Sequence, residues 1–266
     1  MGWTLTVSIV LYTLGFINSL FGFFRKRQFF ANIALALVGG GFVFHTISLV
    51  LLGIAREHFP ITNLPESLCL LAWFLALTFL FAHIRYDIKA LGTFTLPLVS
   101  LLTLASFFFY DENQTIPPDL KNGWIYLHIS VAFLAYAAFF LTFVSGVLYL
   151  TQEKELKTKN FRFLYFRLPS LHVCDELMRL FLTVGFVAMS LTILSGSISA
   201  PQAWGQSWRG DPKVTASLIT WGIYLVLLLY RLSAWWSSRR AAYISILGFA
   251  SVLITFGINW GVHTYL

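Results

Sequence analysis

Long uninterrupted apolar stretches constrain the fold of this chain more than any other feature. A helix needs about 20 apolar residues to cross the roughly 30 Å hydrocarbon core of a bilayer. Backbone polar groups find no water in lipid, so each such stretch is predicted to be a helix, which pairs its own amides. The eight stretches of sufficient length are residues 3–24, 29–54, 65–84, 90–110, 124–150, 177–199, 214–236 and 242–263.

The composition excludes a soluble enzyme and a disordered chain. Only 11% of the residues are charged and 58% are hydrophobic, whereas soluble domains carry about 25% charged residues. Two cysteines are too few for a metal centre built from thiolates. We therefore predict an all-α polytopic integral membrane protein with about eight transmembrane helices, embedded in the lipid bilayer. No repeat or shift in composition divides the sequence, so residues 1–266 are expected to form a single transmembrane domain.

Positive charge is distributed unequally between the two sides of the predicted membrane. Fourteen of the 18 Lys and Arg residues lie on one side, and the positive-inside rule places that side in the cytoplasm. Both termini are then outside, and the net charge of +7 reflects orientation and not binding of nucleic acid. The cytoplasmic set is Arg25, Lys26, Arg27, Arg85, Lys89, Lys154, Lys157, Lys159, Arg162, Arg167, Arg179, Arg231, Arg239 and Arg240.

The longest segment predicted to lie in water is 152–176, on the cytoplasmic side. Its Lys and Glu pairs suit either a helical extension or a solvated linker that docks another protein. Both the helical extension and the solvated linker therefore stay open as interpretations of this segment.

Two histidines that are distant in sequence reach the same predicted depth at the outer face. His128 lies one turn inside the fifth predicted helix, and His263 lies in the last turn of the eighth. Two neutral imidazoles that face each other across a flat slot are suitable axial ligands for haem iron. Each histidine alone also fits an interfacial position, where water or a lipid headgroup would satisfy the ring.

A Trp-rich segment follows the sixth predicted helix at the outer face. Trp204 and Trp208, four residues apart, would form an apolar shelf able to cover a planar porphyrin, and Arg209 would meet its propionates. Asp211 would cap the next helix, with Pro212 at its first position. An aromatic belt at the membrane interface is the alternative explanation for the tryptophans.

This segment resembles the signature of the cytochrome c assembly family, which includes proteins of the CcsA, CcmC and CcmF types. The shared pattern is W-G-x-x-W-x-x-D-P-K from Trp204, followed by L-I-T-W ending at Trp221. Residues 58–68, HFPITNLPESL, are similar to an outer-loop segment of the CcsA type. Further similarity, to the short HemX/YpjD-like branch, lies in residues 168–171, Gly185-Phe186 and Gly196.

The resemblance implies haem b held at the outer face, with His128 and His263 as axial ligands. It implies a platform formed by Trp204, Trp208, Arg209, Asp211 and Trp221. Apocytochrome c and a CcsB/ResB-like membrane subunit are the implied protein partners, and a bacterial plasma membrane is the implied location.

The chain departs from the larger family members in the Trp-rich segment and in the seventh predicted helix. Arg209-Gly210 stands where the family usually has a Trp. Val214 stands where the family commonly has Glu, and Leu229 replaces a histidine that belongs to an internal haem site. His45 is a candidate substitute for that histidine, with helix packing beside Ser48 as the alternative. His58 is a second candidate for a secondary site.

We therefore expect a haem-binding membrane protein that assists cytochrome c maturation by holding or delivering haem. The sequence lacks a catalytic motif in a plausible context, so at most the chain is a subunit of a haem ligation system. One rival is a HemX-like regulator of glutamyl-tRNA reductase, which would use residues 153–172. A second rival is a transporter of another planar ligand.

Overall fold

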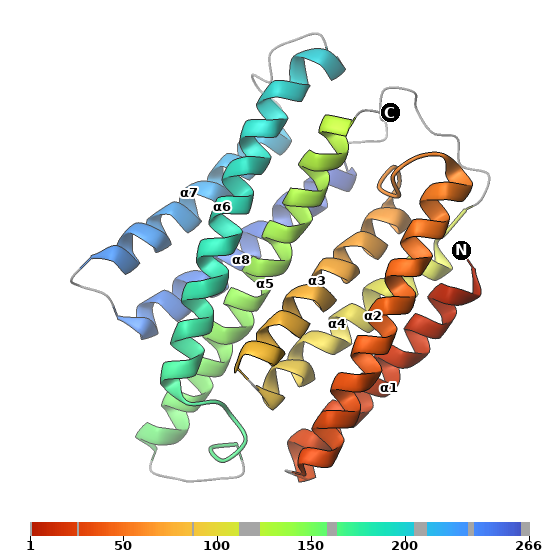
Figure 1. Ribbon diagram of the computed structural model, residues 1–266. Helices are drawn as coiled ribbons and strands as arrows, with labels where there is room; N and C mark the ends of the chain where they lie inside the picture. Colours follow the sequence, from red (N-terminus) through yellow and green to blue (C-terminus); the bar gives the residue numbers. More distant parts are fainter. Residues whose placement is uncertain are drawn as a thin grey trace. The chain divides into compact units, whose positions relative to one another are not determined.

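The computed structural model describes residues 2–25, 27–86, 88–111, 123–158, 164–204, 212–233 and 237–261. Across these ranges eight helices are long and apolar enough to cross a membrane. This result confirms the predicted all-α polytopic architecture. The helices are α1 (Trp3–Arg25), α2 (Gln28–Arg56), α3 (Leu64–Tyr86), α4 (Lys89–Phe108), α5 (Gly123–Lys157), α6 (Leu171–Trp204), α7 (Pro212–Leu232) and α8 (Ser238–Gly261) (Figure 1).

The helices α5 and α6 are longer than the apolar stretches that predicted them. α5 continues through Lys157 and α6 begins at Leu171. Both ends of the 152–176 segment are therefore helical extensions. Residues 152–157 are Gln, Glu, Lys and Leu, all strong helix formers. Hydropathy marks where a chain enters lipid, and a helix made of such residues continues past that limit.

The helices are grouped into two compact units. Unit 1 comprises Met1–Thr115 and Lys154–Ser170, and it contains α1 to α4. Unit 2 comprises Ile116–Glu153 and Leu171–Leu266, and it contains α6 to α8 with most of α5.

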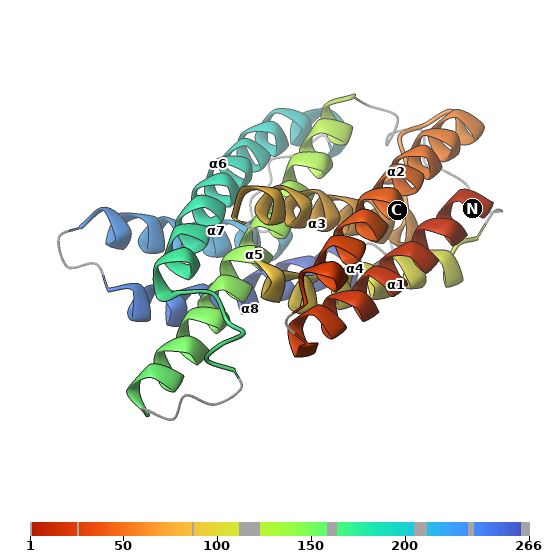
Figure 2. The ribbon, with the colours of Figure 1, turned by 60° about the horizontal axis from the view of Figure 1, so that its bottom comes forward.

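Unit 1 is a ring of four helices in which α1 packs on α2 and α4, and α3 packs on the same two. Figures 1 and 2 show α1 and α2 side by side and running in opposite directions. Their approach depends on Gly41, because a Cβ atom there would lie 2.9 Å from Tyr12 Cδ1. Ser8 Oγ also donates to the Gly41 carbonyl at 2.9 Å. Small residues and interhelical hydrogen bonds of this kind hold helices together in lipid.

Unit 2 has an aromatic core joined by polar contacts. Phe139 of α5 stacks on Tyr224 of α7, with ring centroids 3.5 Å apart and ring planes 9° apart. Arg231 near the end of α7 pairs with Asp175 of α6, with 3.1 Å between Nη2 and Oδ2. The pair is largely buried, so α6 and α7 are fixed to each other at the end that the sequence predicts to be cytoplasmic.

Candidate functional site

His128 projects from the second turn of α5 onto α6. Its Nδ1 lies 2.9 Å from the Thr192 carbonyl oxygen and 3.2 Å from Ser195 Oγ. A carbonyl can only accept, so Nδ1 carries the hydrogen and donates it. In the neutral ring, Nε2 then keeps its lone pair.

Ser195 reinforces this arrangement. Its hydroxyl donates to the Thr192 carbonyl at 3.0 Å, so its oxygen faces Nδ1 as a second acceptor. None of the hydrogen bonds among the described residues uses Nε2 of His128. A histidine that binds a metal typically donates its other ring N–H to a carbonyl in this way. The arrangement suits the predicted role of His128 as an iron ligand.

Trp221 is held on a different face of α6. Its Nε1 donates to Ser190 Oγ at 2.9 Å, and its ring stacks on Phe186 with centroids 5.6 Å apart. Phe186 and Ser190 lie roughly half a turn around the helix axis from Thr192 and Ser195, at about 100° per residue. Within unit 2 the structure therefore does not place Trp221 beside His128.

The remaining residues of the predicted outer site lie at the limits of the described chain. Trp204 is the last residue of α6, so the helix continues past its predicted end at residue 199. α7 begins at Pro212, which confirms proline at the first helical position. The predicted shelf, propionate contact, helix cap and second axial ligand stay predictions, because they depend on residues outside the described ranges. Those residues are Trp208, Arg209, Asp211 and His263.

His45 is fully buried inside unit 1, where both ring nitrogens have neighbours. Nδ1 lies 3.3 Å from the Tyr12 hydroxyl, and Nε2 lies 3.1 Å from Cys69 Sγ. Cys69 is also hydrogen-bonded to Ser106, so the chain of contacts takes one side chain from each of α1 to α4. Ligation of iron by His45 would require one of these contacts to break, so its secondary role stays a prediction.

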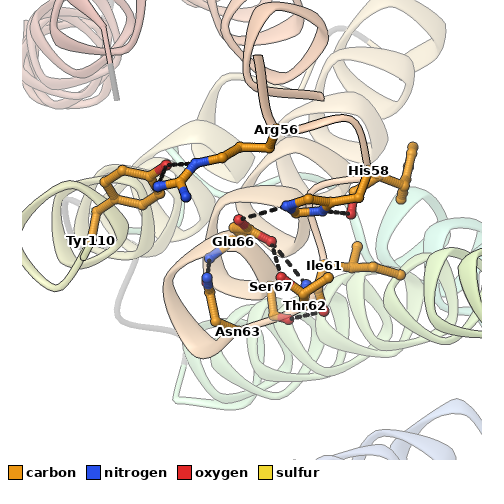
Figure 3. A network of polar contacts seen from close by, with 9 residues as sticks. Arg56, His58, Ile61, Thr62, Asn63, Glu66, Ser67 and Tyr110 are labelled. Carbon is orange, nitrogen blue, oxygen red and sulfur yellow. Dashed lines mark hydrogen bonds and ion pairs between the residues drawn. The ribbon is translucent and has the colours of Figure 1, made fainter. Parts of the chain in front are cut away.

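His58 lies in the segment between α2 and α3 and is almost completely buried (Figure 3). Its Nδ1 donates to the Phe59 carbonyl at 2.8 Å. Its Nε2 makes no hydrogen bond with the described residues and lies 3.9 Å from Glu66 Oε1. Solvent contact is almost absent on both side chains, at 1% for His58 and 2% for Glu66. His58 is thus directed at a carboxylate of its own unit, and its predicted secondary role in haem binding stays a prediction.

Glu66 is the centre of a polar network that the sequence patterns above did not predict (Figure 3). Its Oε2 accepts hydrogen bonds from the Thr62 amide and the Thr62 hydroxyl, each at 2.9 Å. Asn63 Oδ1 accepts from the Glu66 amide at 2.9 Å and so caps α3. The sequence does carry a pattern that indicates this cap, because Asn63-x-x-Glu66 follows the capping-box pattern. In this variant the carboxylate reaches the residue before the cap.

A contact between the last residue of α2, Arg56, and Tyr110, which follows the end of α4, lies close to this network (Figure 3). Nε and Nη2 of Arg56 donate to the Tyr110 hydroxyl at 3.0 and 2.7 Å, and the guanidinium lies 5.4 Å from the centroid of that ring. The segment between α2 and α3 is therefore anchored at its start through Arg56 and at its end through Glu66.

Across the described residues, no three His, Cys, Asp or Glu side chains gather as they would around a bare metal ion. Iron in a porphyrin already has four ring ligands and needs at most two from protein. A single imidazole such as that of His128 is therefore enough to supply one of these two ligands.

The sequence matches a profile described as "Cytochrome C assembly protein" over residues 61–263. A similar protein, "Cytochrome c biogenesis protein CcsA" of Guillardia theta, is 30% identical over 98% of this chain and 93% of its own length. A protein with the same title from Prochlorococcus marinus (strain MIT 9312) is 30% identical over 93% of this chain and 88% of its own.

A solved structure titled "Cytochrome c Heme Lyase CcmF" superposes with a TM-score of 0.67 at 17% identity. The match covers 95% of this chain and 45% of the other. At this identity the likeness is one of fold.

Proposed function

Because the chain belongs to the cytochrome c assembly protein family, we propose that it binds haem at the outer face of the membrane and assists cytochrome c maturation. Haem is the cargo in this proposal. The chain holds or delivers it, and the thiols that become attached to haem belong to apocytochrome c.

The observation that supports this proposal best is the hydrogen bonding of His128. Donation from Nδ1 to the Thr192 carbonyl leaves the Nε2 lone pair available, which is the form of imidazole that binds iron. Bound haem b would supply an iron with two axial positions. His128 and His263 would take these positions, and Trp204, Trp208, Arg209 and Asp211 would contact the macrocycle.

The protein partners follow from the same proposal. Apocytochrome c would present its thiols at the outer face, and a CcsB/ResB-like membrane subunit would complete the ligation system. Both four-helix units would act as one functional domain, since the family match includes parts of each. The proposed location is a bacterial plasma membrane, with both termini outside.

An absorption spectrum of the protein purified in detergent tests haem binding. Two imidazole ligands should give a low-spin Soret band and sharp α and β bands on reduction. Substitution His128→Ala should weaken haem binding, and added imidazole should restore part of it. His172→Ala is the matched control, because its ring is 79% exposed and, among the described residues, pairs only with Glu176 of its own helix.

A protein that purifies without colour and fails to take up haemin would refute haem binding. The maturation role has a separate test in cells that lack this chain. Such cells should lose covalently bound haem from their c-type cytochromes and should recover it with the parent gene. Normal cytochrome c with a changed level of glutamyl-tRNA reductase would favour the regulatory rival.

A further inference from the structure

The ring of His128 lies directly against the backbone of α6 at Gly196. A Cβ atom added at Gly196 would lie 2.8 Å from Cε1, 3.2 Å from Nδ1 and 3.7 Å from Nε2 of the imidazole. Real Cβ atoms essentially never approach a neighbour as closely as the first of these distances. Any other residue at this position would therefore displace the ring or separate α5 from α6.

The same turn of α6 provides the acceptors for the imidazole N–H. The Thr192 carbonyl, one helical turn before Gly196, accepts from Nδ1, and Ser195 Oγ lies beside it. Thr192 and Ser195 are both buried, so their positions are fixed by packing. One turn of helix thus fixes both the donating edge of the ring and its distance from α6.

We propose that Gly196 is a positioning residue of the haem site, because its missing side chain sets how far Nε2 of His128 extends toward iron. The inference rests on the proposed function and adds to it a residue that touches neither iron nor porphyrin. Restoring an ordinary contact of 3.4 Å would move the ring by about 0.6 Å, and functional groups need placement within about 0.5 Å.

The test is Gly196→Ala, compared with Gly222→Ala. Both substitutions put alanine in a helix of unit 2, so both gain the same helix propensity. No atom of the described residues lies within 4 Å of a Cβ at Gly222. Gly196→Ala should weaken haemin binding at least tenfold or convert the low-spin spectrum to a high-spin one. Gly222→Ala should keep the parent spectrum and affinity.

Gly146→Ala separates ligand placement from general crowding. A Cβ at Gly146 would lie 2.5 Å from Ser245 Oγ, so this variant strains the α5–α8 contact without touching His128. It should lose thermal stability while its bound haem keeps the parent spectrum. A spectral change in Gly146→Ala equal to that in Gly196→Ala would overturn the proposal.

A rescue experiment gives an independent readout. In His128→Gly, free imidazole is not tethered to α5 and can settle away from an added methyl group. Gly196→Ala should therefore cost little haem affinity in the His128→Gly background with imidazole, although it costs at least tenfold when His128 is present. An equal cost in both backgrounds would contradict positioning through the His128 ring.

Different experimental results would refute the ligand role of His128 and the positioning role of Gly196. If His128→Ala loses haem while Gly196→Ala keeps the parent affinity and spectrum, the positioning role is wrong and the proposed function stands. If His128→Ala binds haem as the parent does, the ligand assignment is wrong and the positioning role is overturned with it.

Discussion

Removal of the Glu66 carboxylate should destabilise unit 1 by an amount that its hydrogen bonds set. Glu66 is 2% exposed, and its Oε2 accepts two hydrogen bonds at 2.9 Å from Thr62. Bonds to a charged group contribute about 1.5–3 kcal/mol each. At the lower end, Glu66→Ala should reduce the free energy of unfolding by about 3 kcal/mol.

A graded series makes the expected magnitude specific. Neutral hydrogen bonds have about half the strength of charge-assisted ones, so Glu66→Gln should cost about 1.5 kcal/mol. For a chain of this size, roughly 2–4 °C of Tm accompanies each kcal/mol. We therefore expect Tm to fall by about 6–12 °C in Glu66→Ala and by about 3–6 °C in Glu66→Gln.

The assay is thermal unfolding in detergent, followed by loss of the monodisperse peak in size-exclusion chromatography. Glu176→Ala is the control, because Glu176 pairs among the described residues only with the more exposed His172 and Arg179, and such surface pairs contribute about 0–1 kcal/mol. If Glu66→Ala has the same Tm as Glu176→Ala, the network does not stabilise the segment between α2 and α3. If the Tm of Glu66→Gln is as low as that of Glu66→Ala, the charge of the carboxylate does not account for half of the effect.

Three further predictions concern orientation, the Trp-rich segment and the core of unit 1. A reporter active only in the cytoplasm should work when fused after Lys157 and fail after Leu266, and the opposite pattern would reverse the predicted orientation. Alanine at both Trp204 and Trp208 should lower the haem content of purified protein, whereas unchanged content would favour an interfacial belt. Substitution His45→Phe should lower Tm by about 4 °C or more, because it removes the ring nitrogen beside the buried Tyr12 hydroxyl. An unchanged Tm would show that this contact does not stabilise unit 1.

The helices and their number follow from the sequence, because long apolar stretches have one stable form in lipid. The sequence also identifies His128 as a candidate ligand and Pro212 as the start of α7. It does not identify the partners of His128, because Thr192 acts through its backbone carbonyl, a group that every residue carries. The contact with Gly196 likewise depends on how closely two helices approach.

Other differences between sequence and structure have the same origin in packing between helices. His45 reads as an isolated histidine in a span, and only the folded unit places Tyr12 and Cys69 at its two nitrogens. Trp221 belongs to a motif that is continuous in sequence, yet its position on α7 directs it to Ser190. A linear motif specifies neighbours along the chain and leaves the rotation of each helix to its packing.

The two cysteines give the protein one chemical reporter in each unit. Cys69 lies in unit 1 and Cys174 in unit 2, and neither forms a disulfide. Both are at most 1% exposed, so a maleimide can react only when the unit around the thiol opens. Alkylation rates at the two sites would then measure separate opening free energies, with a tenfold change in rate for each step of about 1.4 kcal/mol. The two native cysteines thus allow local opening of each unit to be measured separately in the bilayer.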